Sequence, residues 1–279
     1  MNSMRQRGQI ALIALLVLTI ATTVGLSLIA RTTTDVSVTT NIEESSRAFS
    51  AAEAGIEETL KSGVASAGTL DPTLGISYSV ATASVTGSVG NPLVFPQKTP
   101  NENTETVWLV NHNADGAINE SPTYVQPTID VCWSSETITP AIVVSVLYKT
   151  NGGSYQVAKA AYDPNSDRRV VNNFSAPAAL TGGCGPNTNT TYKSTILFSG
   201  FVPSINSATD TLIALRIRPV YSGAQIAIAP AQDLPNQGTR IQSVGTTASG
   251  VNRKIIVYQQ YRASDSIFDY AVYSENTYE

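Results

Sequence analysis

The chain has 279 residues, a net charge of −4 and a single histidine. The lack of a basic surplus argues against direct electrostatic binding of nucleic acid. Because zinc sites draw on several His or Cys ligands, the single histidine argues against a zinc enzyme. A Ser-His-Asp enzyme would depend on His112, and no G-x-S-x-G motif accompanies it. We read His112, which stands between two asparagines, as a solvated loop residue, and we expect a protein that is not an enzyme and holds no cofactor or metal.

The first element is an uncharged segment, residues 9–30, that follows Arg5 and Arg7 and precedes Arg31. As a helix its 22 positions span roughly 33 Å, enough to cross a hydrocarbon core of about 30 Å. The preceding arginines and the acidic residues after the segment predict a cytoplasmic N-terminus. The alternative is a cleaved signal peptide, whose apolar core is shorter; its best cleavage site, before Arg31, places the bulky Leu28 where a small residue is expected.

A second, amphipathic block continues this helix. Charged residues mostly lie off one apolar stripe, which Gly63 and Gly68 bring to an end. The stripe has the three- and four-residue spacing of a helix face and predicts packing on that face. Its members are Val38, Ile42, Ser45, Phe49, Ala52, Ile56 and Leu60.

Two motifs in this region resemble those of a known family. Arg7-Gly8 before Gln9 resembles the cleavage site of prepilin peptidase. Residues 46–57, which contain Ala51, Ala52, Glu53, Ala54 and Gly55, resemble the signature of PilX-type minor pilins, which are subunits of type IV pili. The resemblance covers about residues 4–62. It implies a leader peptide at residues 1–8 and a pilin-type helix at residues 9–62, with its transmembrane half at 9–30.

The fifth position counted from Gln9 departs from the major pilins. It holds Ile13, whereas major pilins carry Glu there, and this Glu is thought to pair with a neighbouring subunit's N-terminal amine. A carboxylate inside a bilayer costs a few kcal/mol, and Ile13 has neither this cost nor this pair. The resemblance therefore implies an initiating, tip or sparse minor subunit, as in the related tip pseudopilins of type II secretion.

Residues 63–279 form the rest of the chain and predict an extracytoplasmic, β-rich domain. Short apolar runs bounded by Gly, Pro and Asn are typical of strands, and residues 143–157 read as a hairpin with a short glycine loop. The fold class is therefore α+β, with a mostly antiparallel and sandwich-like β domain. The expected strands are residues 107–110, 142–148, 195–198, 212–220, 225–228, 240–244 and 255–261.

The last two strands carry a second resemblance. Ile241, Ser243 and Gly245, followed by Arg253 and Ile255, are similar to the closing hairpin of many minor pilins. The resemblance implies that this hairpin lies against the C-terminal half of the long helix. Residues 92–119, which contain several Pro, Gly and Asn, read as an insertion or surface loop.

The two cysteines, Cys132 and Cys184, both follow the membrane segment. On the oxidising side of a membrane we expect a disulfide. In the chain-entropy model, a disulfide that closes a loop of about 50 residues stabilises the folded state by roughly 4 kcal/mol. Two unrelated thiols are the alternative.

An oxygen-rich segment lies at residues 163–167. Its spacing resembles the start of a calcium loop, but Arg168 stands where that loop needs Gly. We therefore expect an Asx-rich β-turn there.

The leading hypothesis is a non-enzymatic minor pilin-like subunit that helps to initiate, cap or decorate a type IV pilus or related pseudopilus. Its expected partners are other pilin subunits, the pilus assembly machinery, prepilin peptidase and the membrane. It would be a single-pass protein of the cytoplasmic membrane before assembly and extracellular afterwards. One alternative is a membrane-anchored surface protein or adhesin outside any filament, and another is a secreted β-domain hydrolase. The sequence identifies no surface ligand.

Overall fold

The structure, a computed structural model, describes residues 4–113 and 115–266. The chain forms two compact units. Of the described residues, the first unit contains those up to Thr82 together with Ile241–Val257, and the second contains those of Ala83–Arg240 together with those from Tyr258 to Ser266. The closing hairpin thus belongs with the long helix, and this division differs from the boundary drawn at residue 63 on the sequence.

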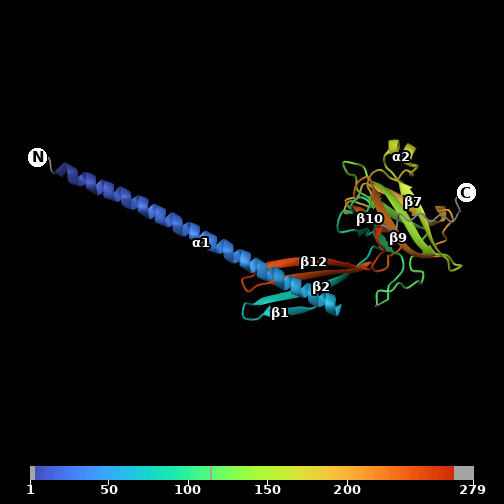
Figure 1. Ribbon diagram of the computed structural model, residues 1–279, viewed down its shortest axis with the longest axis horizontal. Coiled ribbons are helices and arrows are strands. Elements are labelled where there is room, and N and C mark those ends of the chain that lie inside the picture. The colour runs from blue at the N-terminus through green and yellow to red at the C-terminus, as the bar shows by residue number, and fades with distance from the viewer. Residues whose placement is uncertain (1–3, 114, 267–279) are drawn as a thin grey trace. The chain divides into compact units, whose positions relative to one another are not determined.

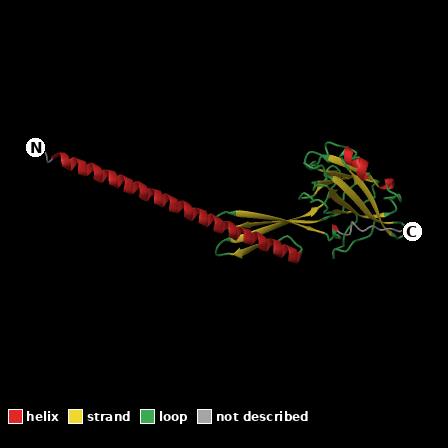
Figure 2. Cartoon of the chain, turned by 45° about the horizontal axis from the view of Figure 1, so that its top comes forward, coloured by secondary structure: helices red, strands yellow, loops and turns green. Residues whose placement is uncertain are grey.

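The first unit begins with helix α1 (Met4–Ser62), the long element shown in red in Figure 2. Threonine hydroxyls in its first half bond back to helix carbonyls, for example Thr23 Oγ1 to Thr19 O at 2.7 Å. These bonds satisfy polar groups without a need for water. The helix ends at Gly63, whose φ of +73° favours glycine and whose N–H donates to Thr59 O.

A four-stranded sheet accompanies the helix in this unit. Its order is β1-β2-β11-β12, and α1 runs along strands of the sheet in Figure 1. The strands are β1 (Ala67–Asp71), β2 (Ile76–Val85), β11 (Gly238–Thr246) and β12 (Asn252–Gln260).

The second unit contains two further four-stranded sheets, and the strand pairs described within them are antiparallel. One has the order β3-β10-β5-β8, formed by β3 (Leu93–Val94), β10 (Ile226–Pro230), β5 (Thr128–Trp133) and β8 (Tyr192–Leu197). The other has the order β4-β9-β6-β7, formed by β4 (Glu105–Trp108), β9 (Thr211–Val220), β6 (Ala141–Lys149) and β7 (Tyr155–Tyr162). The predicted α+β class, with antiparallel sheets after one long helix, is confirmed.

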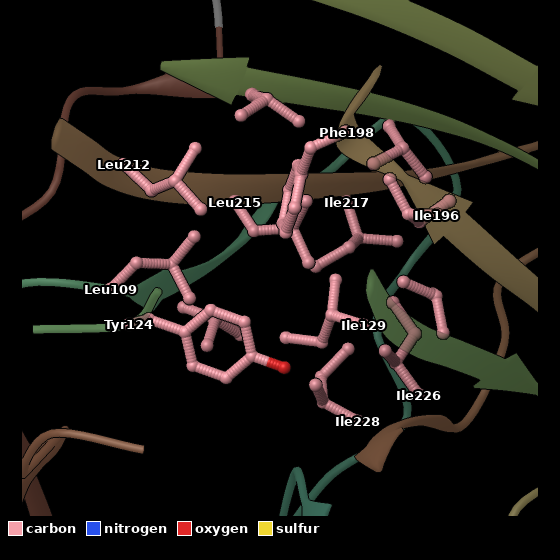
Figure 3. Close-up of a cluster of buried hydrophobic side chains, with 14 of the residues drawn as sticks. Leu109, Tyr124, Ile129, Ile196, Phe198, Leu212, Leu215, Ile217, Ile226 and Ile228 are labelled. Carbon is pink, nitrogen blue, oxygen red and sulfur yellow. The ribbon is translucent and has the colours of Figure 1, made fainter. Parts of the chain in front are cut away.

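Side chains from both of these sheets enter one hydrophobic core (Figure 3). Trp133 is fully buried in it, and its indole N–H donates to Pro140 O at 3.0 Å. Such apolar burial contributes about 25 cal/mol per Å². Other members are Leu109, Tyr124, Ile129, Ile142, Ile196, Phe198, Leu212, Leu215, Ile217, Ile226 and Ile228.

Two local predictions in this unit are confirmed. The hairpin of β6 and β7 is present, with Lys149 opposite Tyr155. Cys132 on β5 forms the expected disulfide with Cys184, at a Cα–Cα distance of 5.7 Å. The bridge attaches a loop that contains three positive-φ glycines to a buried strand.

Two other predictions are wrong. Residues 92–119 are not a surface insertion, because they include β3 and β4, and Val107, Leu109 and Val110 are fully buried.

The oxygen-rich segment is not a β-turn between strands. It begins a short helix, α2 (Ser166–Asn172). A separate 3-10 helix, Phe198–Gly200, follows strand β8. Asn165 caps α2 by accepting from the N–H groups of Asp167 and Arg168. Asp163 is buried and receives Arg168 Nη2 at 2.7 Å. Burial alone would raise the pKa of Asp163. Hydrogen bonds from Arg168, from the Asn165 N–H and from the Asn172 side chain nevertheless hold this pKa below its usual value. These groups therefore form an internal ion pair.

Candidate functional site

The first half of α1 is the part of the chain best suited to a membrane. From Ile10 onward its apolar side chains are exposed all around the helix; Ile13, for example, is 60% exposed. Among the described residues, α1 is the one helix long and apolar enough to span a bilayer. Gly8 and Gln9 lie within α1, but their side chains fall outside the described residues.

The second half of α1 contacts the β11–β12 hairpin through very small residues. Ala48 is fully buried, and a Cβ built on Gly245 would lie 1.9 Å from Ala48 O and 2.6 Å from Ala52 N. The backbone of β11 therefore rests directly on the backbone of the helix, and only glycine fits at position 245. The expectation that the closing hairpin packs on this half of the helix is confirmed.

The signature segment has its smallest residues at this contact. Ala51 and Ala52 are fully buried, and a Cβ on Gly55 would come 2.5 Å from Ser243 Oγ and 2.8 Å from Tyr78 Cδ2. Ala54 is half-buried and Glu53 is exposed. Close packing thus accounts for the Ala and Gly of the segment, whereas Glu53 faces away from the sheet.

The apolar stripe predicted for this helix is only partly correct. Ala52 and Ile56 are buried, and Ile56 packs with Val80 and Ile241. The larger members of the stripe are exposed, because the face that meets the hairpin is the one whose small side chains permit backbone approach. The exposed members are Val38, Ile42, Phe49 and Leu60.

Polar contacts join the tip of the hairpin to the helix at the N-terminal side of this contact. Ser249 donates to Glu44 Oε2 at 2.8 Å, and Arg253 Nε donates to Ser45 Oγ at 2.6 Å. Hydrogen bonding to Thr247 and Ser249 lowers the pKa of Glu44. Sequence reasoning missed these residues, since their only signal was an abundance of Ser and Thr around a hairpin loop.

His112, read from the sequence as a solvated loop residue, lies in an aromatic cluster of the second unit. Its ring stacks on Tyr261 with centroids 3.8 Å apart and meets the Trp108 ring edge-on at 4.7 Å. Its Nδ1 is buried and has no hydrogen-bond partner among the described residues. Burial lowers the pKa of His112. The reading was wrong because Tyr261, far away in sequence, covers the ring.

In the part of the chain that the structure describes, no group of three His, Cys, Asp or Glu side chains is placed to hold a metal ion. Compared with protein families, curated proteins and solved structures, the chain matches none. The arrangement that remains is therefore an exposed apolar half-helix, continuous with a half-helix fastened to a sheet.

Proposed function

We propose that this chain is a non-enzymatic, minor pilin-like subunit that helps to initiate, cap or decorate a type IV pilus or a related pseudopilus. The observation that carries the proposal is the single unbroken helix Met4–Ser62. Its first half is apolar and exposed, and its second half is anchored on a sheet through Ala48, Ala52 and Gly245. A subunit that packs by its apolar half-helix needs the other half to be held firmly by its own folded domain.

The proposed membrane topology places the N-terminus in the cytoplasm and the disulfide-bonded sheets outside. Arg5 and Arg7 before the apolar segment support this orientation, as does the Cys132–Cys184 disulfide, a bond typical of oxidising compartments. The partners would be the apolar helices of other pilin subunits, together with the assembly machinery.

The proposed position in a filament is the tip or a sparse site along it. Ile13 is an exposed apolar side chain on the membrane half of α1, so it offers no carboxylate to a neighbour's terminal amine. The second unit, which we interpret as a β-sandwich because its two sheets share one core, would then be displayed at the surface.

The test is the N-terminus of the mature protein, measured by mass spectrometry in cells that contain an active prepilin peptidase. We expect a start at Gln9, and we expect Gly8→Val to abolish this cleavage while Gly25→Ala, a change inside the helix with nothing within 4 Å of the new methyl, leaves it intact. A start at Met1 would instead favour a membrane-anchored surface protein. A start near Arg31 would overturn the pilin proposal and favour a secreted protein.

A further inference from the structure

The tip of the β6–β7 hairpin contains Asn151 followed by Gly152, the one Asn-Gly dipeptide of the sequence. The Gly153 N–H donates to Thr150 O at 2.8 Å, and the Thr150 N–H donates to Ser154 O at 2.9 Å. These two bonds close the turn between the strands. All four residues from Asn151 to Ser154 are exposed, so the asparagine side chain is open to water.

The side chain of an asparagine can be attacked by the backbone nitrogen of the residue that follows it. This nitrogen loses its proton to water or hydroxide, bonds to the side-chain Cγ and expels ammonia, which leaves a cyclic imide. Water then opens the imide at either carbonyl and gives Asp or iso-Asp. One water is consumed and one ammonia is released, with no enzyme, metal or oxidant. A Cβ on the attacking residue hinders the approach, and glycine has none.

The attacking nitrogen would be that of Gly152. Within the part of the chain that the structure describes, no hydrogen bond engages the Gly152 N–H. The N–H groups of Asn151, Gly153 and Ser154 are all donated. A Cβ built on Gly152 would meet nothing closer than Thr150 Oγ1, at 3.7 Å. The space around this glycine is therefore open.

The turn can also rearrange to bring this nitrogen to Cγ of Asn151. Gly153 has a φ of +88°, and a Cβ there would meet nothing within 4 Å. The nearest buried residues along the two strands are Tyr148 and Ala158. Two consecutive glycines without packed neighbours thus allow the tip to open locally while the core stays folded.

We propose that Asn151 is a site of spontaneous deamidation, which converts it to Asp or iso-Asp in the folded protein. The product adds a negative charge to the residue whose N–H is donated to Asp210 Oδ1 at 2.9 Å. Asp210 also receives the Asn206 N–H, so its carboxylate attaches the hairpin tip to the loop before β9. Carboxylates at positions 151 and 210 repel each other, and iso-Asp lengthens the backbone by one carbon. The modification therefore loosens this attachment.

The test is peptide mass spectrometry of the purified full-length chain, incubated in maltoside micelles at pH 6 and pH 8 with its disulfide intact. We expect Asn151 to gain one mass unit, and to do so faster at pH 8, because the attacking nitrogen must lose a proton. The internal control is Asn187, which is also exposed but precedes the branched Thr188. An Asn151 that stays unmodified in the folded protein, or that reacts no faster than Asn187, would overturn the proposal.

A variant then identifies the nucleophile. The backbone at Gly152 is not in the left-handed region, so Gly152→Ala should fold normally, which near-UV circular dichroism verifies. It should nearly abolish the modification of Asn151. Gly25→Ala adds the same methyl group inside α1, with nothing within 4 Å, and should leave the rate unchanged. A folded Gly152→Ala protein that deamidates as fast as the wild type would exclude this mechanism.

The consequence for the hairpin is tested with one of the products. Asn151→Asp should lower the melting temperature at pH 7, and the loss should shrink in concentrated salt, which screens the repulsion from Asp210. Asn187→Asp makes the same change at the control position and should have a smaller effect. An Asn151→Asp protein as stable as the wild type would refute the loosened attachment to Asp210.

Discussion

The two units of this protein are stabilised in opposite ways. In the first, Gly245 and Ala48 bring the backbones of a strand and a helix into contact. In the second, large side chains such as Trp133 and Ile217 form one hydrophobic core to which two sheets contribute. The helix–hairpin contact is therefore sensitive to atoms that are added, whereas the core of the second unit is sensitive to atoms that are removed.

The largest effect is expected when a large core side chain is removed. Trp133→Ala should lower the free energy of unfolding of the second unit by about 3–5 kcal/mol, because it creates a cavity and leaves Pro140 O without its donor. Chemical denaturation with amide exchange of residues 83–240 measures this loss. Leu180→Ala, at a position 55% exposed, is the control, and a similar loss there would contradict the explanation.

The next effect concerns the disulfide, which supplements the core of the same unit. The double change Cys132→Ala and Cys184→Ala should cost about 2–4 kcal/mol, since the unfolded chain regains the freedom that the crosslink removes. Thermal unfolding of the variant and of the wild type, each with and without reductant, is the measurement. Reductant should destabilise the wild type and leave the variant unchanged; a variant as stable as the oxidised wild type would refute this account.

The reverse sensitivity is tested in the first unit by adding one methyl group. Gly245→Ala should destabilise the helix–hairpin contact by about 1–3 kcal/mol, because the new Cβ would overlap Ala48 O. Faster amide exchange in residues 43–62 would report the loss. Gly152→Ala, whose Cβ would meet nothing closer than 3.7 Å, should have little effect on this exchange. Equal amide exchange rates in residues 43–62 of the two variants would contradict the expected sensitivity of the first unit to added atoms.

The smallest effect is a pH dependence at the hairpin tip. The pKa of Glu44 is lowered from 4.5 in the folded protein, first through hydrogen bonding to Thr247 and then through Ser249. The free energy that the ionised Glu44 carboxylate contributes to the folded state is therefore fully present above about pH 4.5. It is lost as the pH falls through the lower pKa that Glu44 has in the folded protein. Amide exchange of the hairpin, measured between pH 3 and 6, should accelerate less on acidification in Glu44→Gln than in the wild type. The expected difference is roughly a few tenths of a log10 unit in the exchange rate. Identical profiles would exclude this role.

Local patterns accounted for much of the fold. The uncharged segment at residues 9–30 and the glycine at position 63 anticipated α1 and its end. The alternation around Asn151 anticipated the β6–β7 hairpin, and the two cysteines anticipated their own bridge. Each of these features depends on residues close in sequence, or on a pairing with only one possible partner.

Residue patterns along the chain therefore predict the elements: a membrane-length helix, its amphipathic continuation and a series of strands. The helix face that meets the sheet is known only from the folded protein, since it depends on the fit between Ala48 and Gly245, about 200 residues away. The same holds for the burial of His112 by Tyr261. These contacts arise from shape and exclusion of water between distant segments, which periodicity along the chain does not record.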